Sequence, residues 1–205
     1  DPEQKLKLSQ QTIESCRQYL QQDPDYVPIL NLYIGALRLE TECKMENTKY
    51  SVTEGKLLEA IRLAEKSDKI DSTSQMAKYE RAYCLFRLAL LCGLAEKTND
   101  AYAIFRKAIS AELKLVKTGT NKALHRRLLY HTVLAFADLT PPSMSKEALK
   151  YLDAALIVCD TALLSPKEAE RNLLNKIRLL YNKGYLLRVQ NELDKAIEIQ
   201  DEVLD

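Results

Sequence analysis

The sequence of 205 residues has no tryptophan, few glycines and prolines, and almost no net charge. Thirty basic and twenty-nine acidic residues leave a net charge of +1, so no overall field draws the chain to nucleic acid or to an anionic membrane. With five glycines and six prolines, the residues that most often interrupt helices are scarce. What remains is 46% hydrophobic and 29% charged, a composition that favours helices.

Long apolar runs are also missing. The longest, around Leu85 to Leu94, is interrupted by Arg87 and is too short to span a bilayer, and no cationic and apolar signal segment opens the chain. We therefore expect a protein without a membrane span, located in the cytoplasm or the nucleus. Because the sequence begins at Asp1 instead of Met, we interpret it as a fragment of a longer protein.

Paired cysteines are absent as well. The five cysteines are odd in number and form no C-x-x-C motif, so we expect neither a disulfide framework nor a zinc site. Each lies within an apolar helical pattern, which is typical of small buried residues in a reducing compartment. They are Cys16, Cys43, Cys84, Cys92 and Cys159.

A pattern of a small, a large and a small residue, at positions i, i+4 and i+7, recurs along the chain. These spacings place all three residues on one helix face. The copies are Thr12, Cys16 and Tyr19; Ala60, Ala64 and Ser67; Ala101, Phe105 and Ala108; Ala148, Leu152 and Ala155; and Ala196, Gln200 and Val203. Their first members are 48, 41, 47 and 48 residues apart, and the two end copies are degenerate. This spacing predicts a helical repeat in which small residues let neighbouring helices approach closely.

Two of the repeats indicate helical hairpins. A small residue, Ala89 or Gly184, stands twelve positions before Ala101 or Ala196, the distance expected for two packed helices joined by a short turn. Further positions of these two units follow the same scheme: Leu85, Leu88, Cys92, Phe105 and Ala108 in one, and Leu180, Leu187 and Val203 in the other. At these positions the sequence resembles the tetratricopeptide repeat (TPR) family. The resemblance implies a right-handed α-solenoid of antiparallel helical hairpins, whose first helices line a concave groove that binds partners.

The intervals of 41 to 48 residues exceed the TPR unit of about 34 and also suit HEAT and armadillo arrays. We prefer an extended TPR-like hairpin because the small-to-small spacing fits that family. The expected fold is a single all-α solenoid over residues 1–205, with further repeats or a partner beyond Asp205, since the last helix is apolar on more than one side. The expected helices are 3–22, 27–43, 53–68, 74–95, 99–117, 121–139, 145–163, 166–190 and 192–205. A capping box formed by Ser165 and Glu168 predicts the start of the eighth.

No catalytic chemistry emerges from the sequence. Motifs for metal-dependent hydrolysis, serine nucleophiles and phosphate-binding loops are absent. The only histidines, His125 and His131, are six residues apart and face different sides of a helix, so they cannot share a metal. We expect neither enzymatic activity nor a cofactor or metal site.

The candidate partner site lies on the eighth expected helix, where helical spacing places Arg178, Tyr181, Tyr185 and Arg188 on one face. Tyrosine and arginine are enriched at interface hot spots. These residues predict a protein-binding scaffold within a multi-subunit complex, and its partner is a peptide or helix of acidic character. The alternative is that one or both tyrosines pack against a neighbouring hairpin.

A basic edge is the second candidate. It comprises Lys114, Lys117, Lys122, Arg126 and Arg127, with His125 between them. Such a cluster is typical of a solvated helix face, or of a surface that meets phosphates. The segments 78–84 and 184–204 are similar to the TPR region of the 72 kDa subunit of the signal recognition particle. This resemblance implies, as the alternative function, a ribonucleoprotein-associated subunit that contacts RNA along the basic edge.

Overall fold

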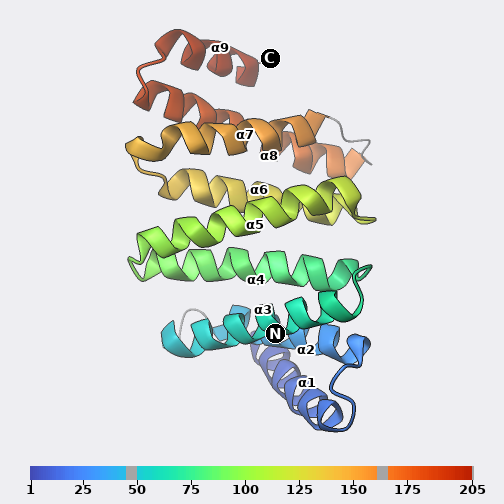
Figure 1. The fold of residues 1–205 in the computed structure, drawn as a ribbon. Helices are drawn as coiled ribbons and strands as arrows, with labels where there is room; N and C mark the ends of the chain where they lie inside the picture. Colours follow the sequence, from blue (N-terminus) through green and yellow to red (C-terminus); the bar gives the residue numbers. More distant parts are fainter. Residues whose placement is uncertain (45–49, 161–165, 205) are drawn as a thin grey trace. The chain divides into compact units, whose positions relative to one another are not determined.

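The computed structural model describes residues 1–44, 50–160 and 166–204, which divide into two compact units, Asp1–Ala111 and Glu112–Asp205 (Figure 1). Over these described residues the chain forms nine α-helices and one short 3-10 helix, and no strand. The expected all-α class is therefore confirmed. None of the described helices is both long and apolar enough to cross a membrane. The prediction of one continuous array stays a prediction.

The first unit contains α1 (Pro2–Gln22), α2 (Val27–Lys44), α3 (Tyr50–Ile70), α4 (Gln75–Leu94) and the first part of α5 (Thr98–Thr118). From α1 to α4, each helix contacts the next one along the chain. In addition α2 contacts α4, so alternate helices of this unit also lie together.

The second unit contains the rest of α5, followed by α6 (Lys122–Leu139), η1 (Pro142–Met144), α7 (Ser145–Asp160), α8 (Pro166–Val189) and α9 (Leu193–Leu204). From α6 to α9 each helix contacts the next, and α6 also contacts α8. The pairing of α6 with α8 therefore repeats the pairing of α2 with α4. Figure 1 shows α6, α7 and α8 side by side.

The helix boundaries agree with the predicted ones to within three residues wherever the structure describes them. Side-chain caps explain two of the starts: Ser74 accepts a hydrogen bond from the Ala77 amide at 3.3 Å, and Asn121 accepts one from the Leu124 amide at 3.2 Å. Pro166 is the first residue of α8, but the capping box predicted at Ser165 lies outside the described residues.

The repeated small residues are buried in the three central copies of the pattern. All nine of these side chains are almost completely buried: Ala60, Ala64, Ser67, Ala101, Phe105, Ala108, Ala148, Leu152 and Ala155. In the two end copies, Tyr19 and Gln200 are exposed. The predicted packing seam is confirmed for the three central copies. In each end copy, at least one position of the pattern carries an exposed residue and does not belong to a buried seam. Four of the five cysteines are buried and all five are free thiols; Cys43 is half-buried.

Two turns of the chain have the same backbone geometry. After α4, Glu96 adopts a positive φ of 58°, and the Lys97 amide donates to the Cys92 carbonyl at 2.9 Å. After α8, Asn191 adopts a φ of 62°, and the Glu192 amide donates to the Leu187 carbonyl at 2.9 Å. This left-handed C-terminal cap ends the helix and starts a tight turn. The two turns occur in the two units of the sequence that best follow the repeat pattern.

Candidate functional site

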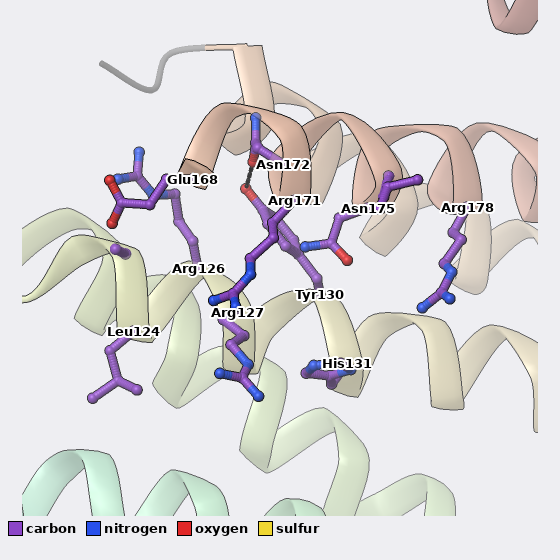
Figure 2. Close-up of a pocket in the computed structure, with 12 residues that line it drawn as sticks. Leu124, Arg126, Arg127, Tyr130, His131, Glu168, Arg171, Asn172, Asn175 and Arg178 are labelled. Atoms are coloured by element: carbon purple, nitrogen blue, oxygen red, sulfur yellow. Dashed lines mark hydrogen bonds between the residues drawn. The ribbon is translucent and has the colours of Figure 1, made fainter. Parts of the chain in front are cut away.

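A cavity of about 510 Å³ lies between α6 and α8 in the second unit (Figure 2). Helical spacing brings its lining together, because residues three, four or seven positions apart share a helix face. From α6 the lining includes Leu124, Arg126, Arg127, Tyr130 and His131, and from α8 it includes Glu168, Arg171, Asn172, Leu174, Asn175 and Arg178.

Hydrogen bonds hold one wall of the cavity in place. The hydroxyl of Tyr130, a buried residue of α6, donates to Oδ1 of Asn172 on α8 at 3.1 Å. The amide nitrogen of Asn172 in turn donates to the carbonyl of Cys159 on α7 at 3.1 Å. These bonds therefore connect α6, α7 and α8 next to the cavity and hold together the helices from which its charged side chains start.

The cavity carries an excess of positive charge. Its four guanidinium groups, from Arg126, Arg127, Arg171 and Arg178, face a single carboxylate, that of Glu168. Within the part of the chain that the structure describes, no carboxylate lies within ion-pair distance of Arg127, Arg171 or Arg178. Figure 2 shows these three side chains on the side of the helices that also carries His131.

The positive charge of the cavity affects the pKa of His131. Desolvation by surrounding side chains lowers the pKa of His131 below its usual value, and the positive charges of Arg127 and Arg178 lower it further. At neutral pH the imidazole is therefore uncharged, and the positive charge of the cavity belongs to the arginines. The arginine that lowers this pKa on α6 is Arg127 and the one on α8 is Arg178, so both helices contribute positive charge around the ring.

An exposed aromatic surface continues from the cavity along α8. Arg178 lines the cavity, and the next residues on its face, Tyr181 and Tyr185, are 68% and 57% exposed. Arg188, one turn further, is also exposed. Neither tyrosine is buried, so most of each side chain is available to a partner, while the alternative that one or both pack in part against a neighbouring hairpin stays a prediction. All four predicted partner-binding residues thus lie on an accessible face, and only Arg178 reaches the cavity.

The predicted basic edge separates into two groups. Arg126 and Arg127 line the cavity, whereas Lys114, Lys117 and Lys122 are exposed and do not. His125, between them in sequence, is buried. A Cβ atom added to Gly119 would lie 2.5 Å from the His125 ring, so this histidine packs against the turn before α6 and is not part of a phosphate-contacting surface.

Of the residues that line the cavity, the sequence predicted only Arg126, Arg127 and Arg178 as site residues, and the missed ones include Arg171 and His131. Arg171 stands seven positions before Arg178, two helical turns along the same face, so the predicted stripe could have been extended to it. His131 stands four positions after Arg127 on α6, but its role depends on Arg178 of α8, and the sequence does not reveal that contact between helices.

Charged side chains at the corresponding α2–α4 contact in the first unit are satisfied internally. The Arg38 guanidinium forms ion pairs with Glu42 and Glu80, both at 2.7 Å, and lies 4.9 Å from the centre of the Tyr83 ring. Burial raises the pKa of Glu80, and the charge of Arg38 opposes that rise. This cluster is structural, because its cation already has two anionic partners.

A second buried acid, Glu112, lies on α5 at the start of the second unit. Its Oε1 accepts a hydrogen bond from Thr132 at 2.7 Å, while its Oε2 has no hydrogen-bond partner among the described residues. Burial raises the pKa of Glu112 to about 8, so its carboxyl group is largely protonated at neutral pH.

The sequence matches no model of a known protein family, and comparison with curated proteins finds no significant match.

Proposed function

We propose that this chain is a non-enzymatic protein-binding module that captures an acidic segment of a partner protein on its α6–α8 face. The proposed architecture is a right-handed solenoid of antiparallel, TPR-like hairpins. The contact of α2 with α4 and of α6 with α8 supports this architecture, because alternate helices of stacked hairpins lie next to each other. The repeated turns at Glu96 and Asn191 support it as well.

One observation carries the proposed function: arginines without anionic partners lie next to exposed tyrosines on one continuous helix face. Desolvated arginine and tyrosine side chains commonly supply much of the binding energy at protein interfaces. An acidic segment would give the arginines the partners that this chain does not provide.

The cavity lining gives no support to an enzyme. Its described residues include no serine, cysteine, lysine or aspartate, and its one carboxylate and one imidazole, those of Glu168 and His131, come from different helices. The side chains of this lining are therefore better suited to binding a ligand than to catalysing a group transfer.

The size of the surface sets the size of the ligand. From Arg171 to Arg188 the axis of α8 rises about 25 Å, at about 1.5 Å for each residue. An extended peptide covers this distance with about eight residues. A labelled peptide of about ten residues is therefore long enough to test the site.

Fluorescence anisotropy with three such peptides tests the function. One alternates Glu and Leu, and the others replace every Glu with Gln or with Lys. We expect the acidic peptide to bind about tenfold or more tightly than the Gln peptide, because only it supplies anions to Arg127, Arg171 and Arg178. The double variant Tyr181→Ala and Tyr185→Ala should weaken its binding by about tenfold.

Tyr26→Ala is the matched control, since Tyr26 is an exposed tyrosine of the first unit, and it should leave the affinity unchanged. Equal binding of the acidic and Gln peptides would contradict the proposal. So would tighter binding of an oligouridine of about ten nucleotides that weakens steeply with salt, since that is the behaviour of a phosphate-backbone site such as the predicted basic edge.

A further inference from the structure

Positive charges from α6 and α8 line the same cavity, where an anion could contact several of them at once. Arg127 of α6 and Arg178 of α8 line this cavity, and the positive charge of each lowers the pKa of His131, which lies between them in Figure 2. Arg171 lines the same cavity, two helical turns before Arg178 on α8. The hydrogen bonds through Tyr130 and Asn172 hold α6 and α8 together, so both helices present their arginines to the same cavity.

The amount of charge favours a doubly charged ligand. Four guanidinium groups against the one carboxylate of Glu168 leave an excess of three positive charges. A carboxylate side chain would offset one of them, whereas a phosphate monoester carries nearly two negative charges and three acceptor oxygens at neutral pH. Planar guanidinium groups bind such oxygens in pairs, and several arginines can share one phosphate.

The surroundings of the cavity favour a phosphate carried by a protein segment. A nucleic-acid backbone presents a phosphate at every nucleotide and is matched by a row of cations. Beyond Arg178, however, the face of α8 presents Tyr181 and Tyr185 before the next arginine, and the lysines of the predicted basic edge do not line the cavity. The charge is therefore concentrated at one end of an aromatic surface, which suits one phosphorylated residue with apolar neighbours.

We propose that the cavity between α6 and α8 binds the phosphate of a phosphoserine or phosphothreonine in a partner segment, with Arg127, Arg171 and Arg178 as its ligands. The residues that flank the phosphate lie along Tyr181 and Tyr185. This inference rests on the proposed function and specifies its ligand: phosphorylation of the partner acts as the switch for binding. The exposed Leu174, between Arg171 and Arg178 on the cavity wall, borders the ester end of the phosphorylated side chain.

Three degenerate peptide libraries of about ten residues test the inference by fluorescence anisotropy. They share their flanking positions and differ only in a fixed central phosphoserine, serine or glutamate. We expect the phosphoserine library to bind at least about tenfold more tightly than the serine library, and more tightly than the glutamate library. Arg171→Gln should remove most of this preference, and Arg178→Lys should reduce it, because lysine keeps the charge and loses the paired hydrogen bonds.

Arg62→Gln is the matched control. Arg62 is an exposed arginine of α3 in the first unit, and its Nε donates to the carbonyl of Leu58 in its own helix, so its replacement should preserve the preference. A readout that does not depend on affinity comes from the pKa of His131, measured by NMR. Binding of a phosphoserine peptide should raise it, because the dianion offsets Arg127 and Arg178.

The outcomes separate this inference from the function on which it rests. If the serine and phosphoserine libraries bind equally and Tyr181→Ala with Tyr185→Ala still weakens both, the phosphate site is refuted and the protein-binding function stands. A phosphoserine preference that survives Arg171→Gln and leaves the pKa of His131 unchanged would also refute the site. If no library binds and oligouridine does, both proposals fail.

Discussion

The α2–α4 contact of the first unit and the α6–α8 contact of the second have the same place in their units but treat charge in opposite ways. In the first, Arg38 has Glu42 and Glu80 at 2.7 Å. In the second, Arg127, Arg171 and Arg178 line a cavity without carboxylate partners among the described residues. A repeated helix arrangement can therefore use arginine for internal stability in one copy and leave it available for a ligand in the next.

The largest expected difference between the two contacts is in stability. Arg38→Ala leaves Glu80, whose side chain is 6% exposed, without its counter-ion, and should lower the free energy of unfolding by about 3–5 kcal/mol. Arg171→Ala removes a side chain with no ion pair and should change it by less than about 0.5 kcal/mol. Urea denaturation of both variants gives the two values. Equal losses would mean that the arginines of the two contacts do not differ in role.

Buried acids extend the comparison, because Glu80 has Arg38 and Glu112 has no cation. Unfolding returns the pKa of Glu112 from about 8 to its ordinary value of about 4.5, so the folded protein retains a proton that the unfolded chain has lost. The free energy of unfolding should therefore fall as the pH rises from about 4.5 to about 8, by at most about 1.4 kcal/mol for each pH unit.

Glu112→Gln should remove that part of the pH dependence, since the amide oxygen still accepts from Thr132 and nothing ionises. Between about pH 6 and pH 8 the free energy of unfolding of the wild-type protein should fall by up to about 2–3 kcal/mol, and that of the variant should not show this fall. Urea denaturation at several pH values compares them. Parallel pH profiles would show that Glu112 is already ionised in the folded state.

The packing seam should respond to volume. Ala108 is completely buried on α5 and Lys107, its neighbour in sequence, is exposed. Ala108→Leu should overpack the site at a cost of about 1–3 kcal/mol, while Lys107→Leu should stay within about 0.5 kcal/mol. Thermal melts of the two variants compare them directly, and equal melting temperatures would remove the physical basis of the repeat.

The smallest effect comes from the two turns with positive φ. Asparagine tolerates this left-handed conformation better than glutamate, so the first unit has the less suitable residue. Glu96→Asn should stabilise the protein by about 0.5–1 kcal/mol, and Asn191→Glu should destabilise it by a similar amount. Urea denaturation checks both, and changes of the same sign would show that the two turns are not equivalent.

Local patterns in the sequence were sufficient to predict the helices. Helical periodicity and breaks such as Pro141 gave the number of helices and their approximate ends, because these signals act within a few residues. The start of α3 was placed three residues late. Tyr50 extends this helix, and its hydroxyl lies 3.4 Å from the Cys92 sulfur of α4, a tertiary contact without a local signal.

The cavity could be predicted only in part. Spacing along α8 identified the face with Arg178, Tyr181 and Tyr185, and charge density identified Arg126 and Arg127 on α6. These two groups line one cavity only because α6 contacts α8. The two helices are separated in the sequence by η1 and α7, so no local pattern reveals their contact. The same limit hid the difference between Arg38 and Arg171, because the partners of Arg38 include Glu80 on another helix.

The most direct test is an NMR titration that follows the Nε–H resonances of the arginines as a phosphoserine peptide of about ten residues is added. If the α6–α8 face is the binding site, the signals of Arg127, Arg171 and Arg178 should shift together with a common affinity. Those of Arg38, already paired with Glu42 and Glu80, and of Arg62, on α3 of the first unit, should stay in place. Shifts at Arg38 or Arg62 with none at Arg127, Arg171 and Arg178 would contradict the assignment of binding to the second unit.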